Sequence, residues 1–406
     1  MGELWDVIIV GAGPGGSACA SYLSQQGYAV LLVDKADFPR DKTCGDALTP
    51  RALAMLDNMG VLPDLLPGSY PITGAEIFAP NGRLIATPIP HVSGAPGQYM
   101  LIVPRMRLDN VLREKAVSSG AQFVGGVHVT SMEPAGDHIV ITGIKDKESI
   151  AYQARMAVIA TGASVKLLLK TGILTQAPAM MVAARAYYKG VENLSDRAQL
   201  RFDGVTLPGY GWVFPISKTS ANIGAGFFAR GRDKARMPAS PQAAFEQFTS
   251  IPALQKMIGH AAQTSPVKGY PLRVDFATAP TFGKRILLVG EAAGLVNPVS
   301  GDGIDYALES GRIAGEHLRR MLDSGDFSAA RHQEYDALLR ERYQDLFVFC
   351  ARIRDLCLKR PYLNTLMRVA AYREDLAMAL IQVVLGAKPI SGDLSVGRIA
   401  RAVLGL

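Results

Sequence analysis

The sequence predicts an α/β fold: a Rossmann-like domain of doubly wound parallel sheet, a second domain of antiparallel sheet, and a helical C-terminal region. Three observations predict it. Residues 6–34 have the pattern of a buried strand, a glycine turn, a helix and a second strand. Apolar and polar residues alternate over residues 180–228, which is typical of antiparallel strands. Helical patterns occupy most of the chain after residue 304.

The composition is that of a globular protein. The chain has 406 residues, 49% apolar and 19% charged, and this length suffices for roughly two to three domains. No apolar run approaches the ~18 residues of a membrane span, and the longest, 376–387, is interrupted by Gln382. The first strand begins at the N-terminus, so we expect no signal peptide. The four cysteines show neither a disulfide framework nor metal-ligand spacing, so we expect a cytoplasmic, reducing setting and no metal site. A monomer is expected.

The formal net charge of +7 has several interpretations. It suits a nucleic-acid surface, an anionic membrane, an acidic cosubstrate, or a chain that merely has a high pI. Blocks of lysine and arginine interleaved with aromatic residues are missing from the sequence. We therefore expect no nucleic-acid partner.

The glycine turn at residues 11–16 predicts a dinucleotide site. Gly11 permits the tight turn, Gly13 lets the backbone approach a pyrophosphate, and Gly16 lets the helix pack against its strand. Asp34 ends the next strand and can accept hydrogen bonds from ribose hydroxyls. An acid there disfavours a 2′-phosphate, so we expect FAD or NAD rather than NADP. A plain β-α-β turn is the alternative.

The loop over residues 35–50 follows directly. Arg40 and Lys42 can neutralise phosphate, and Cys44 with Gly45 brings a thiol and a flexible backbone near the cofactor. Spacing alone favours Cys44 as a small buried hydrophobe. A short helix is expected over residues 51–59.

Further elements follow up to residue 163. Short strands at 75–79 and 84–87 indicate a small sheet outside the nucleotide core. Arg105 opens a helix with an apolar stripe, and it either reaches a phosphate or an isoalloxazine edge, or is a solvated surface residue. Strands are expected at 122–130 and 138–142. A buried strand at 156–160 ends in another glycine turn, and such turns lie at the ligand-binding edge of a doubly wound sheet.

Three aromatic residues alternate in the antiparallel region. Tyr210, Trp212 and Phe214 point to one face if residues 209–215 form a strand. That face is either a sheet core or the wall of an apolar pocket. The flanking prolines and glycines make a poor core strand and favour the pocket. Ser240 and Pro241 then predict the start of a helix.

The nucleotide-type pattern returns near residue 286. A third buried strand ends at Glu291, and a loop with Gly301 and Gly303 opens a long helix from Ile304 to Met321. The amides at its N-terminus can hold negative charge. Residues 331–406 read as basic helices with apolar stripes, which indicates either a helical cap on the core or a surface that docks on anionic lipid.

Together these segments resemble the FAD-dependent geranylgeranyl reductase family, relatives of the para-hydroxybenzoate hydroxylase type of flavoprotein. The matching segments are GAGPGG at 11–16, DKTCGDALTPRAL at 41–53, RMRLD at 105–109, YGWVFP at 210–215 and GEAAGLVNPVSGDGI at 290–304. The resemblance spans residues 5–320. It implies an FAD domain over 1–75, 101–177 and 275–330, a substrate domain over 76–100 and 178–274, and a helical region over 331–406.

The resemblance also implies site residues. Expected cofactor contacts are Gly11, Gly13, Pro14, Gly15, Gly16, Asp34, Lys35, Thr43, Cys44, Gly45, Arg105, Val129, Thr161, Gly162, Glu291, Gly301, Gly303 and Ile304. The substrate wall is expected to comprise Tyr210, Trp212, Phe214 and Pro298. Three departures from the family pattern stand out. Leu207 replaces the first proline of the aromatic motif, Glu291 replaces an aspartate, and Thr161-Gly162 lies where many hydroxylases carry Asp-Gly.

The activity implied is reduction of isolated carbon–carbon double bonds in a prenyl chain by hydride from reduced flavin. Cys44 and Tyr210 are the candidate proton donors, and Trp212 with its neighbours can stabilise transient positive charge. The electron donor is left open between NAD(P)H and another reductant. The alternatives are an FAD-dependent monooxygenase or halogenase acting on an aromatic product, and a flavin-holding binding protein without turnover.

Overall fold

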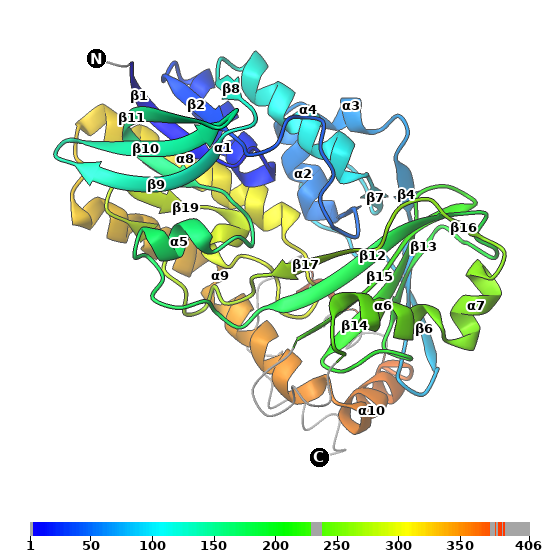
Figure 1. Cartoon of the computed structure of the whole chain (residues 1–406). Coiled ribbons are helices and arrows are strands. Elements are labelled where there is room, and N and C mark those ends of the chain that lie inside the picture. The colour runs from blue at the N-terminus through cyan, green and yellow to red at the C-terminus, as the bar shows by residue number, and fades with distance from the viewer. Residues whose placement is uncertain (1–2, 229–237, 374–377, 379–380, 384, 386–406) are drawn as a thin grey trace.

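The computed structural model describes residues 3–228, 238–373, 378, 381–383 and 385. Two large sheets form the body of the molecule, and the long helix α9 (Ala329–Cys357) runs past both of them (Figure 1). The side chains of Tyr335 and Tyr343 pack into the core of the first sheet, whereas Phe349 and Ile353 pack near strands of the second. The predicted α/β fold class is confirmed.

The first sheet has the doubly wound pattern. Its parallel strands lie in the order β19, β11, β1, β2, β8. They are β1 (Leu4–Val10), β2 (Val30–Val33), β8 (Gln122–Val124), β11 (Glu148–Ile159) and β19 (Ile286–Leu288), with β18 (Phe282–Gly283) antiparallel at one edge and the hairpin β9 (His128–Ala135) and β10 (His138–Lys145) against β11. The apolar runs of β1 and β2 are buried as predicted because helices cover this sheet.

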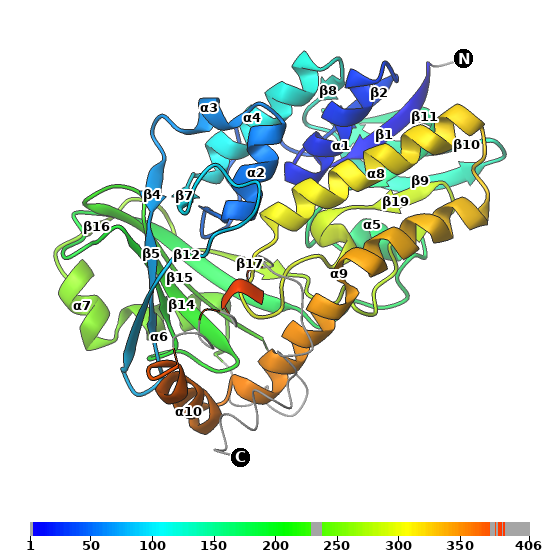
Figure 2. The same ribbon diagram turned by 180° about the vertical axis from the view of Figure 1, so that it is seen from behind.

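Helices α1 (Pro14–Gln25), α4 (Arg105–Ser118) and α8 (Ile304–Ser324) belong to this part, as do α2 (Pro50–Asn58), α3 (Leu62–Leu65) and α5 (Lys166–Lys170). Helix α8 crosses α1 and continues beside α9 (Figure 2). The two helices approach so closely that a Cβ added at Gly311 would stand 2.3 Å from the Gly15 carbonyl oxygen. Two glycines therefore set the spacing between α1 and α8.

The second sheet is mostly antiparallel, as the alternation predicts. Its order is β16, β12, β15, β14, β13, β5, β6, with β17 also paired to β12. The strands are β5 (Gly74–Phe78), β6 (Leu84–Pro88), β12 (Met181–Lys189), β13 (Arg197–Arg201), β14 (Gly209–Pro215), β15 (Ser220–Phe228), β16 (Ala262–Gln263) and β17 (Lys268–Leu272). Strands β5 and β6 extend this sheet, with β5 parallel to β13. The strands expected within residues 75–87 therefore lie outside the nucleotide core, as part of the second sheet and not as a small sheet of their own.

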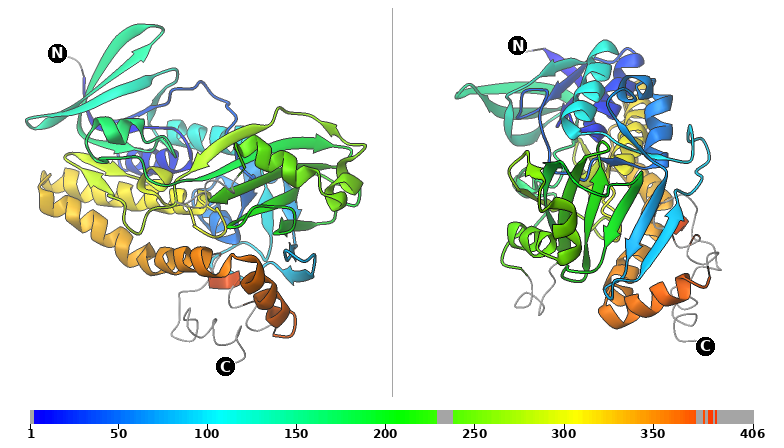
Figure 3. Two further views of the ribbon diagram at one scale, coloured as in Figure 1. Left: turned by 60° about the horizontal axis from the view of Figure 1, so that its bottom comes forward. Right: turned by 90° about the vertical axis from the view of Figure 1, so that its right-hand side faces the viewer.

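The two faces of the second sheet differ. Helices α6 (Pro241–Thr249) and α7 (Pro252–Ile258) cover one face, where a Cβ on Gly211 would meet the Phe248 ring at 2.4 Å. Ser240 caps α6 by accepting from the Ala243 amide, as predicted. The opposite face carries the aromatic residues of β14, and Trp212 and Phe214 there belong to a buried cluster with Ile72, Met100 and Ile102. Figure 3 shows α6 and α7 on the outer side of the sheet.

The structure differs from the sequence-based predictions in two further local features. The expected strand 122–130 is two strands, β8 and β9, because Gly126 between them has a φ of +73° and turns the chain. A small third sheet joins β3 (Ala47–Leu48), β7 (Met100–Ile102) and β4 (Tyr70–Ile72). Helix α10 (Arg360–Ala370) follows α9, while most of the predicted helical tail beyond it lies outside the described residues.

Among the described residues, the helices are all too short or too polar to cross a bilayer. The four cysteines are free thiols, which agrees with the absence of a disulfide pattern in the sequence. Groups of His, Cys, Asp or Glu arranged to hold a metal ion are absent from the described part of the chain.

Candidate functional site

Four segments meet at the carboxyl edge of the parallel strands. The turn of residues 11–16 follows β1, Asp34 follows β2, Gly162 follows β11 and Glu291 follows β19. They are physically joined: the Ala12 amide donates to Asp34 Oδ2 at 2.8 Å, and a Cβ at Gly162 would stand 3.3 Å from Glu291 Oε2. The expected cofactor residues of these four turns therefore share one edge, which is where a doubly wound sheet binds its ligand.

The glycines of the first turn have separate roles. Gly11 has a φ of +112°, and a Cβ there would overlap the Ala160 carbonyl; a Cβ at Gly16 would stand 1.8 Å from the Gly11 oxygen. These two glycines are required by the protein itself. A Cβ at Gly13, by contrast, would meet only Arg40 Nη2, at 3.7 Å. Gly13 also occupies the cap position of α1 and has no side chain to accept from the first-turn amides.

This cradle fits the pyrophosphate of a dinucleotide. The uncapped amides at the start of α1 favour an anion, and the Arg40 guanidinium stands beside them. Arg40 lies 3.8 Å from Asp34 Oδ2 and donates to Asp109 Oδ2 at 2.8 Å. Asp34 also accepts from the Ala36 amide at 2.9 Å, so its carboxylate is oriented by backbone amides at the end of β2.

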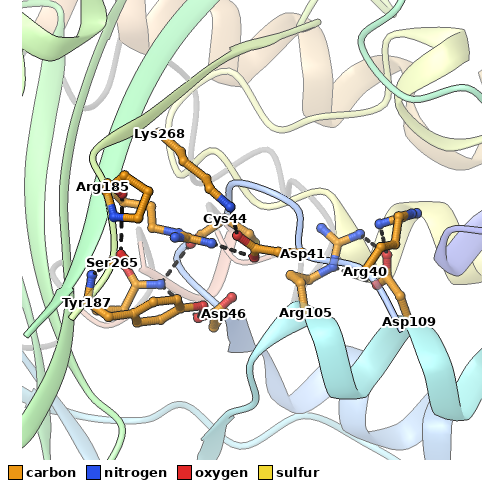
Figure 4. Close-up of polar contacts among 12 residues, drawn as sticks. Arg40, Asp41, Cys44, Asp46, Arg105, Asp109, Arg185, Tyr187, Ser265 and Lys268 are labelled. Atoms are coloured by element: carbon orange, nitrogen blue, oxygen red, sulfur yellow. Dashed lines mark hydrogen bonds and ion pairs between the residues drawn. The ribbon is translucent and has the colours of Figure 1, made fainter. Parts of the chain in front are cut away.

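Arg105 is buried and does not lie at the surface. Its guanidinium donates two hydrogen bonds, of 2.7 and 2.8 Å, to the carboxylate of Asp109, one helical turn later in α4. Burial lowers its pKa, but the Asp109 carboxylate outweighs this, and the nearby Cys44 thiol adds to the net rise. The solvated-surface interpretation is therefore wrong, whereas a contact of Arg105 with a phosphate or an isoalloxazine edge stays a prediction. Figure 4 shows Arg105, Asp109 and Arg40 on one side of the loop that carries Asp41 and Cys44, with Arg185 and Lys268 on the other.

Glu291 is held from two sides. Its Oε1 accepts from the Arg273 amide at 3.2 Å, and its Oε2 lies 3.6 Å from Lys42 Nζ. Lys42 in turn stands over the Tyr270 ring, 4.6 Å from its centroid. Lys42 thus reaches the opposite end of the cradle from Arg40.

The three aromatic residues of β14 lie on one face, as predicted. Their rings follow one another with centroids 6.0 Å apart for Tyr210 and Trp212 and 6.3 Å for Trp212 and Phe214. Gly224 lies opposite Trp212 on β15, and a Cβ there would overlap the indole, so this glycine makes room for the ring. Trp212 and Phe214 are nearly buried, whereas Tyr210 is half-buried.

The Cys44–Gly45 turn packs directly on these rings. A Cβ at Gly45 would stand 2.9 Å from Phe214 Cε2 and 3.5 Å from Trp212 Nε1. Cys44 is half-buried, so the small-hydrophobe interpretation describes it only in part. The contact brings a loop of the first part of the chain onto the aromatic face of the second sheet.

A loop over residues 294–303 lies against Tyr210. The Tyr210 hydroxyl donates to the Ser300 carbonyl, and a Cβ at Gly301 would stand 3.1 Å from that hydroxyl. Burial and the nearby Asp302 raise the pKa of Tyr210. Burial, together with the charge of Asp305, raises the pKa of Asp302 itself to about 7. Gly303 and Ile304 then start α8, and Pro298 is buried within the loop.

The other expected contacts lie around this centre. Thr43 is half-buried beside Cys44, and the Thr161 hydroxyl donates to the Ser164 carbonyl at 3.2 Å. Lys35 is exposed. Val129 lies on β9, opposite Gly143, two residues after Val127, whose amide donates to the Asp34 carbonyl at 2.9 Å. Cofactor contacts at all these positions stay predictions.

Sequence reasoning missed several polar residues of this site. Asp46 is fully buried, and its Oδ2 accepts from the Tyr187 hydroxyl at 2.6 Å and from Asn222 Nδ2 at 2.8 Å. Burial raises the pKa of Asp46 to about 6, against the lowering effect of Tyr187, Asn222 and the nearby arginines. Arg185 is also fully buried and donates to Asp41 Oδ1 at 2.6 Å. A polar residue on the same strand face as two glycines, as in Asn222, Gly224 and Gly226, was the available signal.

The chain matches the family model described as an FAD binding domain over residues 5–347. It is 33% identical over 355 residues to the menaquinone reductase of Mycobacterium tuberculosis, covering 86% of this chain and 83% of that protein. It is 31% identical to the geranylgeranyl diphosphate reductase of Rhodobacter capsulatus, covering 79% and 76%.

Among solved structures, a geranylgeranyl bacteriochlorophyll reductase-like protein from Thermoplasma acidophilum superposes with a TM-score of 0.78, at 21% identity and over 99% of this chain and 96% of that one. Flavin-dependent brominases and halogenases share the fold at lower identity. Fold similarity at this level does not separate reductases from halogenases.

Proposed function

Because the chain belongs to the FAD-binding-domain family, and within it to the geranylgeranyl reductase relatives of para-hydroxybenzoate hydroxylase, we propose that this FAD-dependent oxidoreductase reduces carbon–carbon double bonds of a prenyl chain. The single observation that carries the proposal is the contact of the Cys44–Gly45 turn with the rings of Trp212 and Phe214. It combines an apolar aromatic face with a thiol at the edge of the nucleotide cradle.

The aromatic face suits an isoprenoid substrate. Tyr210, Trp212 and Phe214 form a continuous row of rings, of which Trp212 and Phe214 are nearly buried and Tyr210 is half-buried. Any part of this row that a prenyl chain contacts would contribute hydrophobic free energy and exclude water. An isolated alkene does not react readily with hydride, so its two carbons need precise placement. A wall of rigid rings provides that placement at low entropic cost.

FAD, when bound and reduced, supplies a hydride to one alkene carbon. The other carbon needs a proton, and two side chains on the aromatic face carry one. The Tyr210 hydroxyl already donates to the Ser300 carbonyl. The Cys44 thiol lies near the buried Arg105 guanidinium, on the turn that packs against the rings of Trp212 and Phe214. We therefore assign the proton to Cys44 and the orientation of the loop at Ser300 to Tyr210.

The proposal extends to the surroundings of the enzyme. We propose NAD(P)H or another soluble reductant as the electron donor, and a cytoplasmic monomer. Helix α9 packs against residues of both sheets, which supports the helical-cap interpretation for this part of the C-terminal region. The lipid-docking alternative for the basic C-terminal region would give tight sedimentation with anionic vesicles but not with neutral ones.

The test is anaerobic. The purified FAD-loaded protein is reduced chemically, and candidate polyprenyl alcohols, diphosphates and prenylated quinones are added one at a time. Reoxidation of the flavin, with a product two mass units heavier per turnover, supports the proposal. A product that has gained oxygen or halogen, and forms only when O₂ is admitted, supports the monooxygenase or halogenase alternative instead. Flavin that no donor can reduce, in a protein that still binds prenyl lipid, supports a binding protein.

A further inference from the structure

Asn222 lies between the Cys44–Asp46 turn and the aromatic residues of β14. It lies on β15, fully buried, with Tyr187 of β12 opposite on one side and Phe214 of β14 opposite on the other. Residues opposite one another in adjacent strands share a face of the sheet. Asn222 therefore belongs to the aromatic face, although its side chain is polar.

The side chain of Asn222 forms three hydrogen bonds, to three residues on two different segments. Its Nδ2 donates to the Cys44 carbonyl and to Asp46 Oδ2, each at 2.8 Å. Its Oδ1 accepts from Trp212 Nε1 at 2.9 Å. One amide thus ties both ends of the Cys44–Asp46 turn to the indole of the aromatic face.

The pattern of partners demands an amide. The Cys44 carbonyl and the Asp46 carboxylate accept, so they need two donors, while the indole N–H needs an acceptor. A carboxylate at position 222 would lack the donors, a hydroxyl would supply only one, and an alkyl group would remove all three hydrogen bonds. Each buried polar group left without a partner costs about 1–3 kcal/mol.

We propose that Asn222 is a positioning residue that holds the Cys44–Gly45 turn against the Trp212–Phe214 face. Through its hydrogen bonds to this turn, Asn222 positions the Cys44 thiol relative to a prenyl substrate bound beside the aromatic residues. Asp46 reinforces this arrangement, because the Tyr187 hydroxyl donates to the same carboxylate oxygen that accepts from the Asn222 amide. The effect on turnover rests on the proposed prenyl reduction, whereas the effect on the turn does not.

The test compares Asn222→Asp, which keeps the shape and removes the donors, with Asn222→Gln, which keeps the donors on a longer arm. Gln199→Leu is the matched control. Gln199 is a nearly buried amide on β13 of the same sheet, bonded to Glu76 and Arg201 rather than to the Cys44 turn.

Two readouts are independent of substrate. The first is the rate at which iodoacetamide alkylates Cys44 in a Cys357→Ser background, since Cys19 and Cys350 are buried. The second is Trp212 emission in a Trp5→Phe background, since these are the two tryptophans of the chain. We expect Asn222→Asp to speed alkylation about tenfold, the equivalent of roughly one lost hydrogen bond, and to shift the emission. Asn222→Gln should lie between it and the parent, and Gln199→Leu should match the parent.

Turnover is the third readout. With FAD loading unchanged, Asn222→Asp should lower kcat more than it raises KM, because it misplaces the thiol rather than the aromatic wall. Alkylation and emission that stay at the parental values in Asn222→Asp, or that change equally in Gln199→Leu, overturn the proposal. If Asn222→Asp does not fold, the same two criteria apply to Asn222→Gln. A parent without prenyl reductase activity, but with the expected alkylation and emission changes, refutes the proposed function and leaves the positioning role standing.

Discussion

Gly45 and Phe214 are in such close contact that a Cβ on Gly45 would stand 2.9 Å from Phe214 Cε2 and 3.2 Å from Cδ2. The two residues are separated by most of the first half of the chain, and their contact joins the turn with the thiol to the aromatic face. Any side chain at position 45 must therefore displace the ring or the turn.

Gly45→Ala should lower kcat/KM about tenfold, equivalent to about 1.4 kcal/mol, with FAD binding unchanged. The physical reason is the overlap of the new methyl group with the Phe214 ring. The double variant Gly45→Ala/Phe214→Leu frees that space and should recover part of the loss. Steady-state kinetics and flavin absorbance measure the two effects, and equal losses in the single and double variants would contradict the explanation.

Alanine substitutions at two glycines of the turn at residues 11–16 should affect different properties, stability in one case and FAD affinity in the other. Gly16→Ala places a methyl group 1.8 Å from the Gly11 carbonyl oxygen, so the protein should lose about 3 kcal/mol or more of unfolding free energy. Gly13→Ala meets only the Arg40 guanidinium and should fold normally, but bind FAD at least about tenfold more weakly because the methyl group occupies the anion cradle. Urea unfolding of the apoprotein and FAD titration separate them. Normal FAD affinity in Gly13→Ala would argue against this cradle.

Asp46 makes stability depend on pH. Its pKa is about 6 in the folded protein, above its ordinary value of 3.8, because of burial. Between these values the folded state keeps a proton that the unfolded state releases, so the free energy of unfolding falls as pH rises through this window, by up to about 3 kcal/mol. Asp46→Asn lacks this term and keeps an oxygen that can accept from Tyr187 and Asn222. Asparagine also tolerates the φ of +67° at this position.

Asp46→Asn should therefore gain stability relative to the parent between pH 4 and pH 7, and level off above that. Denaturant unfolding at a series of pH values measures the difference. A difference that is constant across this range would mean that the carboxyl titrates alike in both states.

The two ion pairs of Asp41 should contribute unequally to the free energy of unfolding. Asp41 accepts from Arg185, which is fully buried, at 2.6 Å and from Lys268, which is 45% exposed, at 2.7 Å. Burial raises the pKa of Asp41, but these two cations outweigh it and the net pKa is lowered. Asp41→Ala leaves the Arg185 charge buried without its carboxylate and should cost about 3–5 kcal/mol. Lys268→Met should cost only about 0–1 kcal/mol because water screens that pair. Urea midpoints that rank the two variants the other way would show that the exposed pair dominates.

Cys44 and Tyr210 should differ as proton donors. Cys44→Ala should slow flavin reoxidation by prenyl substrate by about 100-fold, the usual order for loss of a general acid. Tyr210→Phe removes only the hydrogen bond to the Ser300 carbonyl and should slow it about tenfold or less. Single-turnover reoxidation in H₂O and D₂O measures this, with the solvent isotope effect diminished only in Cys44→Ala. The reverse ranking would assign the proton to Tyr210.

Local patterns explain which parts could be predicted. The β-α-β unit of residues 6–34 and the segment 286–304 were readable because strand runs, glycine turns and helix starts are decided by neighbours in sequence. The shared face of Tyr210, Trp212 and Phe214 follows from the two-residue period of a strand. The break between β8 and β9 was missed although Gly125 and Gly126 marked it.

The polar centre of the site could not be predicted in the same way. Asn222 meets Cys44 across 178 positions and Tyr187 meets Asp46 across 141. Those contacts depend on the register of β12, β15 and β14 and on which loop settles on the sheet, and neither is visible in local periodicity. The burial of Arg105 likewise depends on its pairing with Asp109, which the helix period permits but does not require.

The parallel pairing of β5 with β13 has a consequence for dissecting the molecule. A fragment cut at residues 178 and 274 would contain β12 to β17 but lack β5 and β6, so the backbone amides and carbonyls along Arg197–Arg201 would be exposed at an open border. An unpaired sheet edge of this kind can form hydrogen bonds with strands of other molecules. The excised piece should aggregate, whereas one that carries residues 74–88 fused to it should stay in solution.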